Sequence, residues 1–290
     1  MLSRFLRMAA LAAALPVLAQ DYEIRLHRPD RVGDKTKFSG VCKNRQEMTA
    51  WADGKKILEE NKDLAVNFEG IGTVLEVSPK GKAKRLSLQV DKLSAMEGKI
   101  QKELLPRGTV VVAANVAKKK VFEVNGKAVQ PEVARALQLV VSVGSDDHTD
   151  DEMYGTRERK RVGDSWDVNR TALMEELSGP NMSVNDIRGQ ATLKNVLKDA
   201  EGTRLFVTFE MTGEGVTAAG GGSMVPGTPT LLKFTRTGEF PTDPSLPCVA
   251  ETMEASFSAR GKRRPAPNGP EMEIRMDMQL SQKAKFTAVK

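Results

Sequence analysis

An acidic run in the middle of the chain holds the side chains that could best bind a metal ion. Hard cations such as calcium bind several oxygen atoms, and carboxylates supply them. The run lacks the glycine and the spacing of a helix–loop–helix calcium site, so the alternative is a solvated linker whose charges stay in water. We expect no metal, and the ligands best placed to bind one are Asp146, Asp147 and Asp150. The full run comprises Asp146, Asp147, His148, Asp150, Asp151 and Glu152.

The common catalytic signatures are absent from the sequence. His27 and His148 are the only histidines, and neither lies at a metal-ligand spacing from another His or Cys. No nucleophile elbow, phosphate-binding loop or dinucleotide fingerprint is present, so we expect no cofactor. A pair of carboxylates could still perform acid–base chemistry, because spacing in the sequence does not reveal such a pair. These absences favour a protein that is not an enzyme.

The segment EMEIRMDMQL, residues 271–280, alternates apolar and polar side chains. Successive side chains of a strand point to opposite faces, so this pattern predicts a strand with one dry face and one wet face. The methionine thioethers on the dry face could bind copper, but their alternation with Ile274 and Leu280 favours a place in the core. Strands that are wet on one side belong to antiparallel sheets, and the segment 249–259 is the expected partner.

The tetrapeptide Arg-Val-Gly-Asp occurs twice, and each copy precedes a strand-like segment. Gly33 and Gly163 supply backbone freedom at a tight turn, and the side chains of Asp34 and Asp164 can bond the backbone beside them. Trp166 follows the second copy and is expected to be a core anchor. A paired acid site would require the two turns to meet in space, so we predict structural roles for all five residues.

The repeated tetrapeptide, together with the similar segments KRLSLQV and TRLFVTF, predicts two related halves. The halves span residues 20–145 and 152–290, and an acidic linker at 146–151 separates them. The expected fold class is mainly β and antiparallel, with two related halves forming curved sheets or a partial barrel and one or two short helices. A glycine-rich stretch at 218–229 has no apolar periodicity, which predicts a mobile loop.

Local signals place the turns and the best helix. Asp53-Gly54 and Asn125-Gly126 are dipeptides that accept positive φ angles at the tight turn of a hairpin. The segment 131–141 begins with a proline, which suits the first helical turn, and carries an apolar stripe at helical spacing. We therefore predict two hairpins and one helix at these positions.

The segment KRVGDSWDV, the alternating block EVNGKAV and the methionine- and glutamate-rich closing hairpin together resemble an exported bacterial β-rich family of unknown function. Members of that family carry a "vGDsW" motif at the start of their second half. The resemblance covers most of the mature chain in the order of its features, and it implies a mainly antiparallel β fold with no known activity. The proline-rich segment 237–248 departs from the pattern where a smooth strand entry is expected.

Residues 1–19 run from basic to apolar to small side chains, which predicts a secretory signal peptide. The apolar run is shorter than the about 20 residues that a membrane-spanning helix needs, and no later stretch qualifies. The formal net charge of +6 is spread along the chain, and aromatic side chains are too few to stack on bases. We therefore expect an exported protein of the periplasm or cell envelope that does not span the membrane and binds no nucleic acid.

The two cysteines, Cys42 and Cys248, form no metal motif. Because thiols usually oxidise outside the cytoplasm, we predict a disulfide between them that joins the first strand of the chain to the closing hairpin. Such a bond requires Cα atoms within about 7 Å of each other. The alternative is two buried free thiols that pack as small apolar residues.

These patterns are compatible with three functions. The first, which we expect, is a non-enzymatic envelope protein that acts as a binding or interaction module. The second is a carrier for an apolar ligand such as a lipid, because curved antiparallel sheets can enclose an apolar cavity and methionines suit an adaptable lining. The third is a hydrolase that uses a pair of carboxylates. A void against the Met272–Leu280 face would favour the carrier.

Overall fold

The computed structural model describes residues 20–117, 119–144, 148–177, 182–218, 230–263 and 272–289. The predicted signal peptide, the candidate ligands Asp146 and Asp147, and all but the first residue of the predicted loop 218–229 lie outside these ranges. Within them the chain forms mainly β structure, with three helices.

The strands and helices have the following bounds. Residues 35–140 form β1 (Lys35–Ala52), β2 (Lys55–Val77), β3 (Ala83–Glu97), β4 (Ile100–Leu105), β5 (Val110–Val116), β6 (Lys119–Val124), β7 (Lys127–Ala128) and α1 (Pro131–Val140). The remainder contributes α2 (Asp150–Tyr154), β8 (Ser165–Asp167), α3 (Arg170–Leu177), β9 (Met182–Ser183), β10 (Asp186–Asp199), β11 (Gly202–Glu214), β12 (Thr217–Ala218), β13 (Thr230–Pro241), β14 (Ala250–Arg263) and β15 (Met272–Ala288).

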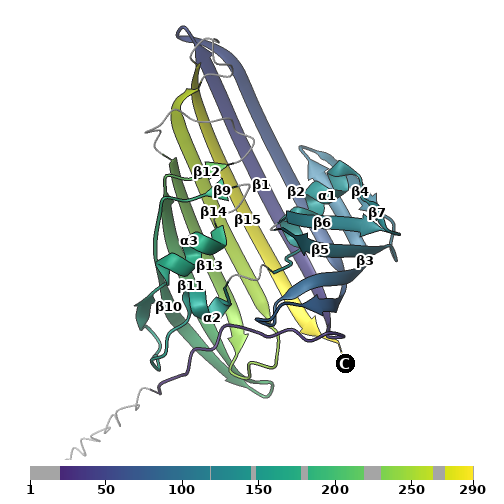
Figure 1. Cartoon of the computed structure of the whole chain (residues 1–290), viewed down its shortest axis with the longest axis vertical. Coiled ribbons are helices and arrows are strands. Elements are labelled where there is room, and N and C mark those ends of the chain that lie inside the picture. The colour runs from purple at the N-terminus through teal and green to yellow at the C-terminus, as the bar shows by residue number, and fades with distance from the viewer. Residues whose placement is uncertain are drawn as a thin grey trace, which may run out of the picture.

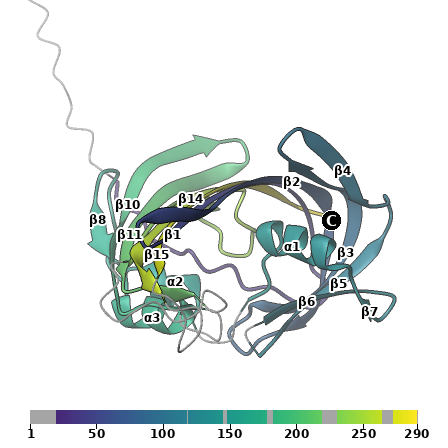
Figure 2. The same ribbon diagram turned by 90° about the horizontal axis from the view of Figure 1, so that it is seen from above.

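Thirteen of the described strands form one antiparallel sheet that does not close on itself. Its order is β7-β6-β5-β3-β2-β1-β15-β14-β13-β11-β10-β8, with β4 paired to β3, while β9 and β12 pair separately. Seen from above, the sheet is an arch, and the helices lie inside it (Figure 2). The expected mainly antiparallel β fold is confirmed, and the described residues form three short helices where one or two were expected.

The middle of the arch is a pairing between the first and the last strand. β1 pairs with β15 in unbroken register from Thr36 opposite Ala288 to Ala52 opposite Met272. The hairpins β1–β2 and β14–β15 extend together well beyond the helices (Figure 1). The expected placement of the first strand beside the closing hairpin is therefore confirmed.

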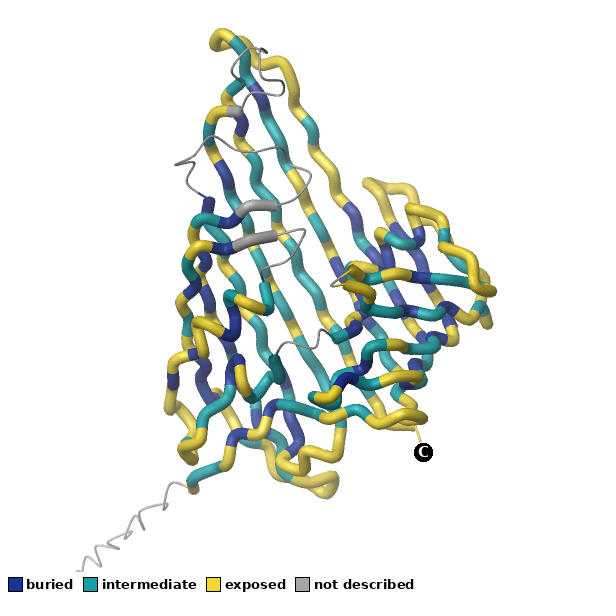
Figure 3. Tube along the Cα trace, viewed as in Figure 1, coloured by how far each residue is buried: buried dark blue, intermediate teal, exposed yellow. Residues whose placement is uncertain are grey.

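The two faces of the sheet differ because side chains alternate along each strand. On β2, for example, Leu64, Val66 and Phe68 are buried on the concave face, and the alternation of buried and exposed residues along the strands is visible in Figure 3. The buried residues form two separate clusters. One lies between α1 and the strands β2, β3 and β5, and the other lies between α2, α3 and the strands β10 and β11.

The two Arg-Val-Gly-Asp turns have the same hydrogen bonds. Gly33 and Gly163 have φ angles of +93° and +96°, a region that favours glycine. The carboxylates of Asp34 and Asp164 each accept a hydrogen bond of 2.8 Å from the backbone N–H of the arginine that begins the turn. Each aspartate therefore supports its own turn.

The two predicted hairpin turns and the predicted helix are confirmed. Asp53-Gly54 has φ angles of 49° and 73°, and Asn125-Gly126 has φ angles of 52° and 71°, as the tightest hairpin turns require. α1 follows the predicted stripe, since its buried residues are Val133, Ala136, Leu137 and Val140.

Trp166 lies on the short edge strand β8 and is 8% exposed. Its indole Nε1 donates a hydrogen bond of 2.7 Å to the carbonyl oxygen of Tyr154. On β1, Phe38 stacks on Phe68 of β2, with ring centroids 4.5 Å apart. Both aromatic residues that follow the repeated tetrapeptide thus point to the concave face.

The predicted disulfide between Cys42 and Cys248 is absent, because both thiols are free. Cys42 pairs with Gln282 on β15, and Gln282 pairs with Met253 on β14, five positions beyond Cys248. Two strand spacings and five residues of strand separate the cysteines by roughly 19 Å. That separation is far beyond the reach of a disulfide. The cysteines belong to different core clusters.

Maleimide labelling of the unfolded protein without reductant is expected to modify both thiols. In the folded protein at pH 8 the reaction should be slow, because burial raises the pKa of both Cys42 and Cys248 to about 11 and the thiolate is the reactive form. Mass spectrometry of the labelled protein measures both results. Two unlabelled cysteines in the unfolded, unreduced chain would contradict the free-thiol state.

Candidate binding cleft

The acidic run forms structural contacts where it can be described. Asp150 lies 3.4 Å from the Arg236 guanidinium, and the Asp151 carboxylate accepts the backbone N–H groups of Leu26 and His27. Among the described residues, no group of three His, Cys, Asp or Glu side chains could hold a metal ion. Asp150, the candidate ligand within the described part of the chain, thus has an arginine as its partner.

Glu152 and His148 complete this region. Glu152 forms a capping box with Thr149 at the start of α2, and its carboxylate accepts a hydrogen bond of 2.7 Å from Lys80 Nζ. The bonds from Lys80 and from the Thr149 backbone lower the pKa of Glu152 to about 2. The His148 ring lies 2.7 Å from Glu175 of α3. These contacts connect the α2 region to the turn between β2 and β3 and to α3.

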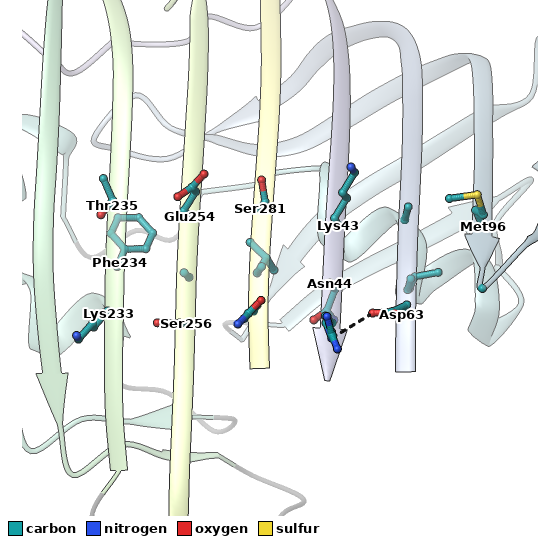
Figure 4. A pocket seen from close by; sticks show the side chains of 17 residues that line it. Lys43, Asn44, Asp63, Met96, Lys233, Phe234, Thr235, Glu254, Ser256 and Ser281 are labelled. Carbon is teal, nitrogen blue, oxygen red and sulfur yellow. Dashed lines mark ion pairs between the residues drawn. The ribbon is translucent and has the colours of Figure 1, made fainter. Parts of the chain in front are cut away.

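A groove of about 730 Å³ crosses the outer face of the sheet. Figure 4 shows its lining side chains, which come from β13, β14, β15, β1, β2 and the end of β3. Polar and charged residues dominate, including Lys43, Glu254 and the ion pair between Arg45 and Asp63. The side chains of that pair are more than half exposed, so the groove resembles an ordinary solvated surface.

A second cavity, of about 680 Å³, lies on the concave face between the two core clusters. We call it the concave cleft. Its floor is formed by β1, β15, β14 and β13, and the apolar floor residues are half-buried. One side is bounded by the end of α1 and the segment that follows it, and the other by α2 and α3. The apolar floor residues include Phe38, Phe234, Met253, Leu280, Ala284 and Phe286.

An extended segment, residues 22–30, crosses the lower end of the arch, and we call it the strap (Figure 1). Its residues Leu26, His27, Arg28 and Asp30 line the cleft. Tyr22 forms an isolated β-bridge with Lys160, and the buried Ile24 and Leu26 belong to the α2–α3 cluster. At the other end, Asp30 donates its backbone N–H to Gly81 in the turn between β2 and β3. The strap therefore joins the two sides of the arch.

The strongest charge cluster in the cleft surrounds Arg236 of β13. Its Nε lies 2.8 Å from Glu251 of β14, its Nη2 contacts Asp150, and the guanidinium lies over the rings of Tyr154 and Phe209. Burial would lower the pKa of Arg236, but Glu251 and Asp150 raise it well above the ordinary value. Both carboxylates therefore serve as counter-ions of one buried cation.

Two lysines on the other side of the cleft also have partners. Lys82 Nζ lies 3.6 Å from Glu176 of α3, across the cleft. Lys120 Nζ donates to the carbonyl oxygens of Val141 and Gln138 at the end of α1, where the helix dipole favours a cation. Burial lowers the pKa of Lys120.

The position of Arg236 in the sequence indicates a charged side chain on the dry face of a strand. In the segment LLKFTRTGEF of β13, Arg236 has the parity of the buried Phe240, so it is a charged side chain on a dry face. Glu251 of β14 lies on the same face as Met253, so it is a second charged side chain on the dry face of a strand. A charge of this kind needs a buried partner, although sequence spacing does not identify the partner.

The fold and the cleft thus define an open, arched antiparallel sheet with a partly apolar cavity on its concave face. No protein-family profile matches the chain, and no curated protein matches it. No helix within the described ranges is long and apolar enough to cross a membrane.

Several solved structures are weakly similar. A structure described as lipid–protein interactions in lipovitellin has 8% identity and a TM-score of 0.36, and covers 90% of this chain, which spans 26% of the lipovitellin chain. An outer membrane channel from Pseudomonas putida F1 has 13% identity and a TM-score of 0.18, over 91% of this chain and 100% of its own. OpdQ from Pseudomonas aeruginosa has 7% identity and a TM-score of 0.20, and the alignment covers 88% of this chain and 98% of the OpdQ chain. At these values the similarities assign neither a family nor a function.

Proposed function

We propose that this protein is an exported, non-catalytic carrier that binds an apolar ligand, such as the acyl chain of a lipid, in the concave cleft. The observation that carries the proposal is the position of the cavity. The two core clusters fill the ends of the arch, while the floor between them keeps half-buried apolar side chains around about 680 Å³ of space. Small-molecule sites are typically concave, mostly apolar cavities of about 300–1,000 Å³.

The chemistry of the lining supports the same function. An apolar surface that remains in contact with water is stabilised when an apolar ligand covers it. Each CH₂ group that a ligand buries contributes about 0.8 kcal/mol, so an acyl chain can supply several kcal/mol before the cost of ordering it. Asp150 and Glu251 are bound to Arg236, which favours binding over a hydrolytic role for this pair.

Purified protein is expected to release lipid on extraction with organic solvent, and to bind the uncharged fluorescent probe N-phenyl-1-naphthylamine. Ala284 lies on the half-buried floor, so Ala284→Trp should fill the cleft and reduce probe binding at least about tenfold, a loss of about 1.4 kcal/mol. Fluorescence titration measures the affinity of each variant.

Lys283→Trp is the matched control, since Lys283 precedes Ala284 on β15 but is exposed on the outer face. This variant adds the same side chain without entering the cleft and should bind the probe like the parent. If Ala284→Trp folds and binds the probe as tightly as the parent, the cleft is not the binding site. An interaction module without an apolar ligand would then be the better function.

A further inference from the structure

We propose that Arg28 of the strap anchors the anionic headgroup of an amphiphile whose apolar chain lies on the floor of the concave cleft. This inference rests on the carrier function proposed above and specifies its ligand class. The cleft contains four basic side chains from lysine and arginine. Arg236, Lys82 and Lys120 have the carboxylate or carbonyl partners described above. Arg28 is the fourth.

Arg28 has few partners for a half-buried guanidinium. Its Nη2 donates to the carbonyl oxygen of Pro241, its Nη1 makes a long contact of 3.4 Å to the carbonyl of His27, and the group lies over the Phe240 ring. Its Nε is buried without a hydrogen-bond partner. Among the described residues Arg28 forms no ion pair, and Asp151, Asp243 and Asp150 influence its charge without contacting it.

The electrostatic setting of Arg28 differs from that of Arg236. Burial is the largest influence on Arg28 and lowers its pKa, and the more distant Cys248, Asp151, Asp243 and Asp150 offset this only in part. Arg236, with two carboxylates in contact, has a raised pKa instead. A guanidinium presents five N–H donors in a planar fork that matches a carboxylate or a phosphate. An anionic headgroup would supply the acceptors that Arg28 lacks.

The position of Arg28 fits an amphiphile that lies along the floor. Arg28 lies on the strap at the lower end of the cleft, where β15 places Phe286, and the floor then continues along β15 to Leu280. That strand segment spans about 20 Å, which exceeds the about 15 Å that one acyl chain spans in half of a bilayer core. Beyond it, Met278 and Met276 continue the same face.

The test compares oleate with its uncharged counterpart monoolein at pH 8, using isothermal titration calorimetry. The wild-type protein is expected to bind oleate about tenfold more tightly, as one hydrogen-bonded charge pair provides. Arg28→Gln should reduce oleate affinity to the level of monoolein and leave monoolein affinity unchanged. Arg25→Gln is the matched control, because Arg25 is an exposed strap arginine paired with Glu23, and it should keep the preference.

A third ligand, 1-oleoyl-lysophosphatidate, identifies the source of the headgroup. Tighter binding of this ligand than of oleate assigns the site to a phospholipid, and the reverse order assigns it to a free fatty acid. Equal wild-type affinities for monoolein and both anionic ligands overturn the inference and leave the carrier function intact, even if Arg28→Gln does not fold. An anionic preference that survives in a folded Arg28→Gln also overturns it. If no ligand binds, the carrier function fails as well.

Discussion

Replacing Trp166 with alanine is expected to lower the free energy of unfolding by about 3–5 kcal/mol, because the neighbours of an emptied aromatic site collapse into it only in part. Trp166 belongs to the cluster between α2, α3 and the sheet, and its indole N–H donates a hydrogen bond to the carbonyl oxygen of Tyr154. β8 pairs with β10 over only three residues, so this edge depends strongly on the anchor. Urea denaturation followed by circular dichroism measures the change.

The second tryptophan of the chain provides the control. Trp51 lies at the far end of β1, opposite Lys56 and Glu273, and belongs to neither core cluster. Trp51→Ala removes the same side chain and should shift the urea midpoint much less than Trp166→Ala. Similar midpoints for Trp166→Ala and the parent would show that Trp166 does not anchor the core.

Arg236→Met is expected to cost about 3 kcal/mol of stability, because it leaves two half-buried carboxylates without their cation. The Arg236 side chain is 15% exposed, and the side chains of Glu251 and Asp150 are 25% and 28% exposed. Methionine fills much of the same volume over the Tyr154 and Phe209 rings. The loss of stability therefore measures the removal of the charge and not a loss of packing. Equilibrium denaturation at pH 7 measures it.

A double-mutant cycle separates the interaction from the cost of an unpaired charge. Glu251→Gln in the Arg236→Met background removes one of the two stranded charges and should recover part of the lost stability. Arg45→Met is the control, since Arg45 of β1 also contacts two carboxylates, Glu47 and Asp63, but its side chain is 61% exposed on the outer face. If Arg236→Met is no more damaging than Arg45→Met, the cluster in the cleft does not stabilise the fold.

Much of the sheet could be predicted from short-range patterns. Period-two alternation identified which side chains of β15 share a face, and Asn125-Gly126 identified a turn, because both signals depend on neighbouring residues. The helix α1 follows for the same reason, since its apolar stripe and its proline are local. The interpretation of the 271–280 face as core needs refinement: Ile274 is buried, but Met276 and Met278 are half-buried on the open concave face.

The disulfide and the cleft could not be derived in this way, because both depend on long-range register. Cys42 and Cys248 lie against the same face of the sheet, but parity does not give their positions along neighbouring strands. Likewise, alternation predicts a dry face on β14 and β15 but not which part of it α1, α2 and α3 leave uncovered. The strap alternates the apolar Tyr22, Ile24 and Leu26 with the polar Glu23 and Arg25, but this local pattern does not show that Arg28 lies beside a cleft.

The pairing of β1 with β15 also determines the order in which the sheet can assemble. The hairpins β1–β2 and β14–β15 can each form around a short connection, whereas joining them brings Thr36 to Ala288 across almost the whole described chain. Contacts of such high sequence separation form slowly, because the closure entropy must be overcome first. Until then β1 is an open edge with unpaired backbone groups, and such an edge is a template for another chain. Truncation before β15 would make that aggregation-prone edge permanent.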